Sequence, residues 1–165
     1  MSLRPLPLPD SISGQVWLSA MPGRFEALAS FLDAAGQAGV TGIVCLTTDA
    51  EIAERSPDYA RARQFGTLPF DRRDHPILDF GLPQDIAQFA RFITDLCADL
   101  VQGKRLVLHC AAGIGRTGVV AQQVLMALGV EPDCARAQVL QAGSGGESIA
   151  QQQFCSQPVV RFAGA

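Results

Sequence analysis

The sequence contains no run of about 18 apolar residues, the length that a helix needs to cross a bilayer. Residues 1–5 also lack the charged and then apolar order of a secretion signal. Basic runs are absent too, and the formal net charge of the 165 residues is −3. This balance argues against nucleic acid or an anionic membrane as the main partner. We therefore expect a cytoplasmic protein that binds neither.

Cysteine is present in an odd number and without the spacing of a metal or disulfide framework. The five cysteines include no CxxC pair, and the sequence has two histidines, which form no cluster near them. We therefore expect reduced thiols, no metal and no cofactor. The five positions are Cys45, Cys97, Cys110, Cys134 and Cys155.

The size and composition of the chain suit one globular domain. Apolar residues make up 48% of the chain and charged residues 18%, enough to bury a sizeable core at this length. Residues 1–14 hold many prolines and polar turn residues, so we expect an extended N-terminal lead-in with little structure of its own. Residues 15–160 then form the single domain.

Short apolar runs alternate with segments of helical periodicity along that domain. The runs predict strands at 15–19, 41–46, 66–70 and 105–109. The periodic segments predict helices at 24–35, 50–64, 86–100, 115–128, 132–141 and 148–153. Strands that alternate with helices indicate an α/β fold with a central, mostly parallel sheet flanked by helices.

One segment concentrates the chemistry, the ten residues His109-Cys110-Ala111-Ala112-Gly113-Ile114-Gly115-Arg116-Thr117-Gly118. Five residues between Cys110 and Arg116 allow the backbone to wrap around a tetrahedral anion with successive N–H groups pointing inward. Gly113 and Gly115 permit the positive φ angles and the close approach that such a cradle needs. A helix that starts near Gly115 turns its positive end toward the same anion. The segment thus predicts a phosphate-binding loop made of residues 111–116.

Four side chains of this segment have predicted roles. The planar fork of Arg116 can hold two phosphate oxygens at once. The positive field of the loop favours the thiolate of Cys110, which is the nucleophilic form. Thr117 can donate a hydroxyl hydrogen bond to that thiolate, and the ring of His109 can hold the loop in place. The predicted reaction is attack of Cys110 on a phosphate ester, giving a phosphocysteine that water later hydrolyses.

A second cysteine and arginine with the same spacing as Cys110 and Arg116 show how much this spacing alone indicates. Cys155 and Arg161 are also separated by five residues. Pro158 in that copy has no N–H to offer, and Phe162 replaces the hydroxyl residue after the arginine. Spacing alone is therefore weak evidence, whereas the complete string with its glycines, strand and helix is strong.

The complete string resembles the signature of the protein tyrosine and dual-specificity phosphatase superfamily. Residues 75–83, His-Pro-Ile-Leu-Asp-Phe-Gly-Leu-Pro, look like the cyclin-dependent-kinase-associated phosphatase subgroup, as do 143–145 and 148–151. The resemblance covers most of residues 15–154. It implies a dual-specificity-phosphatase-like fold and a cysteine-dependent phosphatase activity that needs no metal.

A general acid is also needed, to give a proton to the departing alkoxide or phenoxide. Composition alone leaves Asp71, Asp74 and Asp79 open, since all three lie in a polar segment of loop character. The resemblance implies Asp79, about thirty residues before the nucleophile. It also implies that Gln151 positions the hydrolytic water, although its spacing fits a solvated helix face equally well.

Cys45 has two interpretations. The resemblance implies a redox partner that forms a protective disulfide with Cys110 and guards it against irreversible oxidation. The alternative is a buried, inert cysteine, because free cysteine is commonly part of a core.

The substrate class is predicted from the position of the tyrosine and from the residues inside the loop, compared with other members of the superfamily. The one tyrosine, Tyr59, lies in a polar helix, whereas tyrosine-specific members carry a tyrosine loop that deepens the pocket. Phosphoinositide-directed members typically carry lysines where Ala111, Ala112 and Ile114 stand here. We therefore expect a shallow pocket for phosphotyrosine, and secondarily phosphoserine and phosphothreonine, in a protein or peptide. The alternatives are a phosphoprotein-binding pseudophosphatase and a phosphatase for a small metabolite, a nucleotide or an RNA 5′ end.

Overall fold

The computed structural model describes residues 3–164, in which five strands form one sheet in the order β1-β2-β5-β3-β4. The pairs β2–β5, β5–β3 and β3–β4 are parallel, and β1 runs antiparallel to β2 at the edge. The strands are β1 (Arg4–Leu6), β2 (Gln15–Ser19), β3 (Gly42–Cys45), β4 (Asp71–Asp74) and β5 (Arg105–His109). This architecture confirms the predicted α/β class with a mostly parallel sheet.

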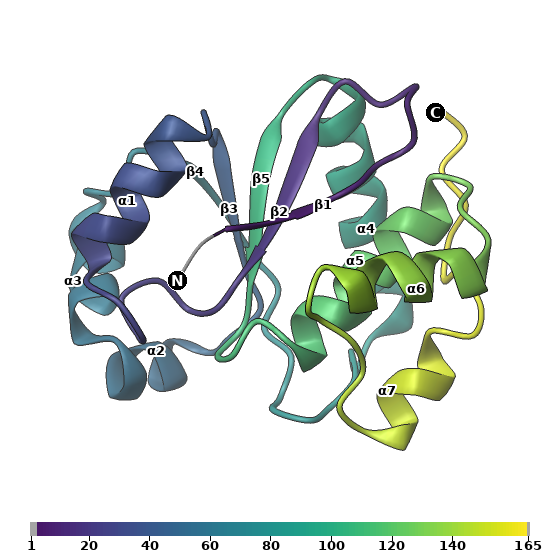
Figure 1. Ribbon diagram of the computed structural model, residues 1–165. Helices are drawn as coiled ribbons and strands as arrows, with labels where there is room; N and C mark the ends of the chain where they lie inside the picture. Colours follow the sequence, from purple (N-terminus) through teal and green to yellow (C-terminus); the bar gives the residue numbers. More distant parts are fainter. Residues whose placement is uncertain (1–2, 165) are drawn as a thin grey trace.

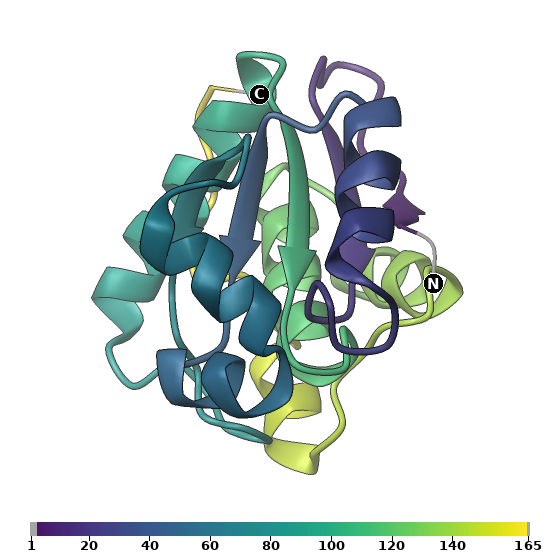
Figure 2. The ribbon, with the colours of Figure 1, turned by 90° about the vertical axis from the view of Figure 1, so that its left-hand side faces the viewer.

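Helices cover both faces of the sheet (Figure 1). One face carries α1 (Leu28–Gln37), α2 (Asp49–Arg55) and α3 (Pro57–Phe65), which stand in front of the strands in Figure 2. The opposite face carries α4 (Ile86–Val101), α5 (Gly115–Ala127) and α6 (Pro132–Gln141), with α7 (Ile149–Phe154) beside α5. Each face has its own cluster of buried apolar side chains. The central strands β3 and β5 lie between the two clusters and are therefore nearly continuous in hydrophobicity, as is typical of parallel strands buried on both faces.

The centre of the sheet positions the site. Strand β5 lies between β2 and β3, and its last four residues are buried. The chain leaves β5 at His109, forms the loop 110–114 and enters α5, whose 13 residues are all buried. The loop therefore lies at the carboxyl ends of the parallel strands, where open α/β sheets bind their ligands.

Two predicted elements, one helix and one strand, differ in kind or continuity from the structure. The helix predicted at 50–64 is broken into α2 and α3 at Ser56, because Pro57 disfavours helical geometry in the residue before it. The strand predicted at 66–70 is wrong: α3 ends at Phe65 with Gly66 as its left-handed C-cap, and the fourth strand is instead β4. Its polar sequence, Asp-Arg-Arg-Asp, gives no hydrophobic signal because this edge strand is mostly exposed.

The lead-in 1–14 also has more structure than its composition predicted. Residues 4–6 form β1 and pair with residues 16–18 of β2. Leu6 packs in the core with 4% of its surface exposed. Among residues 3–164, no helix combines the length and the apolar composition that crossing a membrane requires.

Candidate active site

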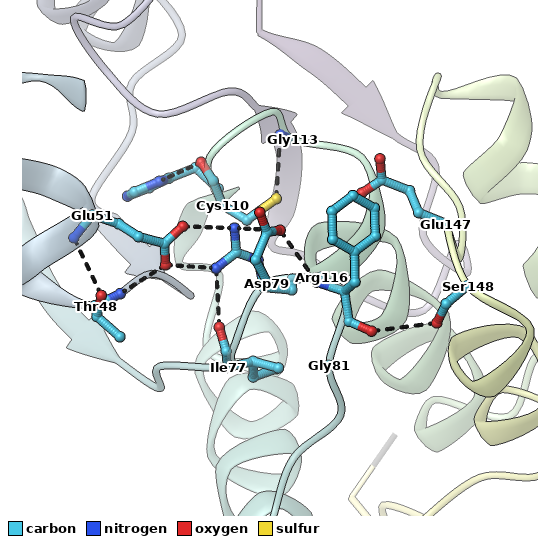
Figure 3. Close-up of polar contacts among 12 residues, drawn as sticks. Thr48, Glu51, Ile77, Asp79, Gly81, Cys110, Gly113, Arg116, Glu147 and Ser148 are labelled. Carbon is cyan, nitrogen blue, oxygen red and sulfur yellow. Dashed lines mark hydrogen bonds and ion pairs between the residues drawn. The ribbon is translucent and has the colours of Figure 1, made fainter. Parts of the chain in front are cut away.

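The loop after β5 curls around the sulfur of Cys110. This residue is 2% exposed, and its Sγ accepts a hydrogen bond from the Gly113 amide at 3.2 Å (Figure 3). Gly113 has a φ of 74°, and a Cβ there would lie 2.3 Å from the Ser19 carbonyl oxygen. Both its positive φ and this close approach require glycine. The cradle predicted from the sequence is therefore closed over the thiol by a backbone turn that other residues cannot adopt without strain.

Carbonyl groups of this loop point to donors outside it. Because the N–H and C=O of a peptide face opposite ways, such donors fix which way the loop amides face. The carbonyl of Cys110 accepts from His109 Nδ1 at 3.2 Å, and that of Ala111 accepts from the Met21 amide at 3.3 Å. The carbonyl of Gly113 accepts from Ser144 Oγ at 2.6 Å. The carbonyl of Ile114 accepts from two amides, that of Gly118 at 2.8 Å and that of Gly145 at 3.2 Å.

Arg116 lies under the loop in the first turn of α5, with 2% of its side chain exposed. Its two terminal nitrogens donate to the two carboxylate oxygens of Glu51, at 2.8 and 3.0 Å (Figure 3). One nitrogen also donates to the Ile77 carbonyl at 3.0 Å, and the other pairs with Asp79 Oδ1 at 3.0 Å. The guanidinium is thus fixed in one plane before any substrate arrives.

Electrostatics keep this pair charged. Burial works to lower the pKa of Arg116, but the hydrogen bond to Glu51 and the negative charges of Cys110, Glu51 and Asp79 raise it above its ordinary value. Burial likewise works to raise the pKa of Glu51, and the hydrogen bond and charge of Arg116 lower it. An arginine cation paired with a carboxylate therefore lies beneath the loop at neutral pH.

Of the three aspartates left open by the composition, Asp79 lies at the loop. Its carboxylate pairs with Arg116, accepts from the Phe80 amide at 3.2 Å and is 45% exposed. Asp74 lies on β4, where Arg63 at 3.1 Å and Arg72 at 3.4 Å neutralise it. Asp71 begins the same strand and is exposed. The arrangement favours Asp79 as the proton donor.

The segment that carries Asp79 is a tight turn fastened to the start of α7. The Gly81 amide donates to the Leu78 carbonyl at 2.8 Å, and Phe80 has a φ of 55°. Gln151 is fully buried and donates from Nε2 to the Gly81 carbonyl at 3.0 Å, while its Oε1 accepts from the Glu147 amide at 2.8 Å. The solvated helix face considered for Gln151 is therefore wrong. Its role in positioning water stays a prediction.

His109 and Thr117 are both completely buried beside the loop. The Nε2 of His109 is 2.9 Å from the hydroxyl of Tyr59, so its ring is held from α3 while Nδ1 reaches the Cys110 carbonyl. The Thr117 hydroxyl has no hydrogen-bond partner among residues 3–164, the Cys110 sulfur included. Its predicted assistance to the thiolate stays a prediction.

Cys45 lies on β3 directly beside His109 of β5. Burial works to raise the pKa of its thiol, but the charge and hydrogen bond of His109 and hydrogen bonds with Thr47 lower that pKa to about 7. The Cys45 side chain packs into the cluster under α1 and α3, whereas Cys110 belongs to the cluster under α4 and α5. The two thiols thus lie on opposite faces of the sheet, and the five cysteines are all free.

Sequence reasoning missed Glu51 and Arg4. Glu51 closes a capping box with Thr48 at the start of α2, immediately after buried strand β3, so a Thr-x-x-Glu pattern following a central strand was the available signal. Arg4, from β1, donates to the Gly113 carbonyl at 2.5 Å, and no local pattern indicated that contact. No group of three or more His, Cys, Asp or Glu side chains suited to a metal is found in residues 3–164.

Comparisons with known proteins give one family model and several structures of similar fold. Residues 24–157 match the family model described as PTP-SAK, Swiss Army Knife protein, DSP-PTPase phosphatase domain. Among solved structures, a kinase associated phosphatase is 21% identical, with a TM-score of 0.78 and coverage of 94% of this chain and 93% of that one.

Two further solved structures contain ligands. PTPMT1 in complex with PI(5)P is 14% identical, with a TM-score of 0.68 and coverage of 86% of this chain and 87% of that one. TpbA from P. aeruginosa in complex with phosphotyrosine is 20% identical, with a TM-score of 0.60 and coverage of 99% and 90%. At these identities the likeness is one of fold.

Proposed function

This chain belongs to the PTP-SAK family of DSP-PTPase phosphatase domains, and on that premise we propose that it hydrolyses phosphate monoesters through a phosphocysteine on Cys110. One observation carries the proposal: the thiol, the Arg116 cation and the Asp79 carboxylate converge on one loop. The Gly113 amide lies 3.2 Å from Cys110 Sγ, and Asp79 Oδ1 lies 3.0 Å from Arg116 Nη2. A nucleophile, an anion clamp and a proton donor are thereby within reach of one phosphate.

In the proposed first step, the Cys110 thiolate attacks phosphorus and the phosphorus–oxygen bond to the leaving group breaks. Protonated Asp79 gives its proton to the departing oxygen, and loop amides with Arg116 stabilise the charge on the three other oxygens. In the second step, water attacks the phosphocysteine, Asp79 takes a proton from that water, and the thiolate is released. Inorganic phosphate is the second product.

Substrate entry requires Asp79 to leave Arg116. The two terminal nitrogens donate to Glu51 and Ile77, and one of them also lies 3.0 Å from Asp79 Oδ1, whereas the buried Nε has no partner among residues 3–164. A phosphate held by two oxygens would use Nε and the terminal nitrogen that now pairs with Asp79. Binding would therefore displace Asp79 from its ion pair and free it to meet the leaving group.

The mouth of the site supports an aromatic phosphate ester as the substrate. Exposed apolar side chains come from the Asp79 turn, the loop and α7: Leu78 and Phe80 are 61% and 59% exposed, Ile114 40% and Ile149 74%. Glu147 approaches the loop as well, since a Cβ on Gly115 would lie 2.3 Å from its Oε2. Apolar contacts suit a tyrosine ring, and a carboxylate at the rim opposes substrates with several phosphates.

We therefore propose phosphotyrosine in proteins or peptides as the preferred substrate, with phosphoserine and phosphothreonine second. A panel of phosphotyrosine and phosphoserine peptides, PI(5)P in detergent micelles and 5′-nucleotides would measure the preference. We expect kcat/KM for the phosphotyrosine peptides to exceed that for PI(5)P by at least about tenfold. The reverse order would assign the site to lipid headgroups, for which the fold likeness to PTPMT1 with PI(5)P is a precedent.

The first experiment is hydrolysis of para-nitrophenyl phosphate by wild type and Cys110→Ser with EDTA present. We expect wild-type turnover and a loss of at least about a thousandfold in the variant. Cys155→Ser is the matched control, because Cys155 is a buried free thiol with the same spacing to an arginine, and it should keep its activity. Inactive wild type that still binds tungstate would favour a phosphate-binding pseudophosphatase.

A further inference from the structure

Arg4 reaches the phosphate loop from outside the segment that matches the family. It lies on β1, whereas the match begins at residue 24. Its Nη2 donates to the Gly113 carbonyl at 2.5 Å, and its Nη1 donates to the carbonyls of Ala142, at 3.1 Å, and Gly143. One guanidinium therefore joins the edge strand, the end of α6 and the catalytic loop.

The hydrogen bond from Arg4 acts on the site through the backbone of Gly113. Its amide faces the Cys110 sulfur, and its carbonyl accepts from Arg4 and from Ser144 Oγ on the other side. Because the peptide between Gly113 and Ile114 is planar, the direction of that carbonyl also sets the direction of the Ile114 amide. The hydrogen bonds that Arg4 and Ser144 donate to the Gly113 carbonyl thus determine which way the Ile114 amide faces.

Pairing with β2 and the end of α6 hold Arg4 in position. In the antiparallel pair Arg4 lies opposite Leu18, and the next inward residue, Leu6, is buried. Ala142 is the C-cap of α6, so the guanidinium also meets the negative end of a helix dipole. The strand pairing and the burial of Leu6 that add β1 to the sheet therefore also place the Arg4 guanidinium at the loop.

Charge supplies a second link. Burial lowers the pKa of Arg4 below its ordinary value, and the negative charge of Cys110 works in the opposite direction. The guanidinium and the sulfur therefore interact, and the cation on Arg4 contributes to the positive field that an oxyanion meets in the loop.

We propose that Arg4 is a positioning residue of the phosphate loop, so that strand β1 is part of the active site. The proposal rests on the function proposed above for the loop, but it concerns anion binding and not turnover. Removing the guanidinium should let the Gly113 peptide rotate and weaken oxyanion binding, even in a protein that cannot complete the reaction.

The chain offers a matched control in Arg105. This arginine also donates to the carbonyl of a helix C-cap, Ala38 of α1, at 2.9 Å from Nε and 2.6 Å from Nη2. It stands at the start of β5, the end of the strand opposite the loop. Arg4→Met and Arg105→Met should therefore lose a similar amount of thermal stability while differing at the site.

The test is tungstate affinity, measured by titration calorimetry in Cys110→Ser, Cys110→Ser with Arg4→Met, and Cys110→Ser with Arg105→Met. We expect Arg4→Met to weaken tungstate about tenfold and Arg105→Met to leave it unchanged. Arg4→Lys keeps the charge and one donor, so it should recover part of the loss. In the active protein, Arg4→Met should lower kcat/KM by a similar factor.

Unchanged tungstate affinity in a folded Arg4→Met variant would overturn the proposal. If Arg4→Met does not fold, wild-type affinity in Arg4→Lys together with Ser144→Ala would overturn it equally, since that pair removes the Ser144 donor and reduces the guanidinium contact to one lysine donor. Failure of the phosphatase proposal looks different: wild type would then bind tungstate in an Arg4-dependent way without hydrolysing any ester.

Discussion

The carboxylate of Glu51 and the guanidinium of Arg116 form a two-point ion pair, with nitrogen–oxygen distances of 2.8 and 3.0 Å. Glu51 is at the start of α2 and Arg116 is at the start of α5, on opposite sides of the sheet. The pair holds the guanidinium in one orientation, in which the buried Nε has no partner among residues 3–164. Orientation of the anion clamp thus depends on a residue 65 positions away in the chain.

Glu51→Gln should lower kcat/KM for para-nitrophenyl phosphate by about ten- to a hundredfold. The amide keeps one acceptor but offers an N–H to the guanidinium, so the two-point contact is lost and Arg116 is no longer fixed. Glu54→Gln, a charge change in the same helix, is the control and should leave kcat/KM unchanged. Equal activity of wild type and Glu51→Gln would contradict the assigned role.

The same pair should make stability depend on pH. Since Arg116 lowers the pKa of folded Glu51, the ion pair stabilises the protein fully above the ordinary glutamate pKa of about 4.3 and loses its effect as pH falls through the lower folded value. Urea unfolding of wild type and Glu51→Gln should therefore differ by a constant amount from pH 7 to about pH 5. The difference should shrink below about pH 4. A difference that grows in acid would show the opposite sign.

Asp79→Asn should slow hydrolysis of esters with poor leaving groups more than of esters with good ones. Phenyl phosphate needs a proton for its departing oxygen, whereas para-nitrophenyl phosphate needs little help, so we expect a loss at least about tenfold larger for the former. Asp74→Asn serves as the comparison, because Asp74 is engaged by Arg63 and Arg72. The same leaving-group dependence in Asp74→Asn, and not in Asp79→Asn, would transfer the acid role to Asp74.

Gln151→Ala separates the two roles open to this buried amide. As a clamp between Gly81 and the start of α7, Gln151 holds the Asp79 turn, and its loss should slow both chemical steps. As a residue that positions water, it would affect the second step alone. Rapid-quench measurement with para-nitrophenyl phosphate should show no burst of nitrophenol in Gln151→Ala. A burst with accumulated phosphocysteine would favour the water-positioning role implied by the family resemblance.

Mild peroxide should oxidise Cys110 without linking it to Cys45. The two thiols pack into clusters on opposite faces of the sheet, so a disulfide between them needs movement of the loop. Peptide mapping should find the sulfenic and then the sulfinic form of Cys110, with Cys45 reduced. A Cys45–Cys110 disulfide, formed when the Cys45 thiol displaces water from the sulfenic acid, would establish the protective role instead.

Local patterns predicted most of the fold. Helix α6 has the predicted bounds, and α4 and β5 begin and end within a residue or two of their predicted limits. Pro132 marks the start of α6, a strong apolar period marks α4, and a continuous apolar run marks β5. The failures fall where tertiary context overrides such patterns. Polar segment Asp71–Asp74 forms strand β4 because its backbone pairs with the open edge of β3. Arg4–Leu6 forms strand β1 because it pairs in the same way with the edge of β2.

The sequence by itself determined the phosphate loop, since its cysteine, glycines and arginine lie within ten consecutive residues and their spacing is the geometry of the cradle. It also limited the proton donor to three aspartates. Only the tertiary structure placed one of them, Asp79, at the loop and supplied the partners of the loop: Glu51 for Arg116, Gln151 for the Asp79 turn and Arg4 for Gly113. These contacts join residues that are 65, 70 and 109 positions apart in the chain. Local periodicity and spacing cannot predict such contacts, because they form only when helices and strands pack together.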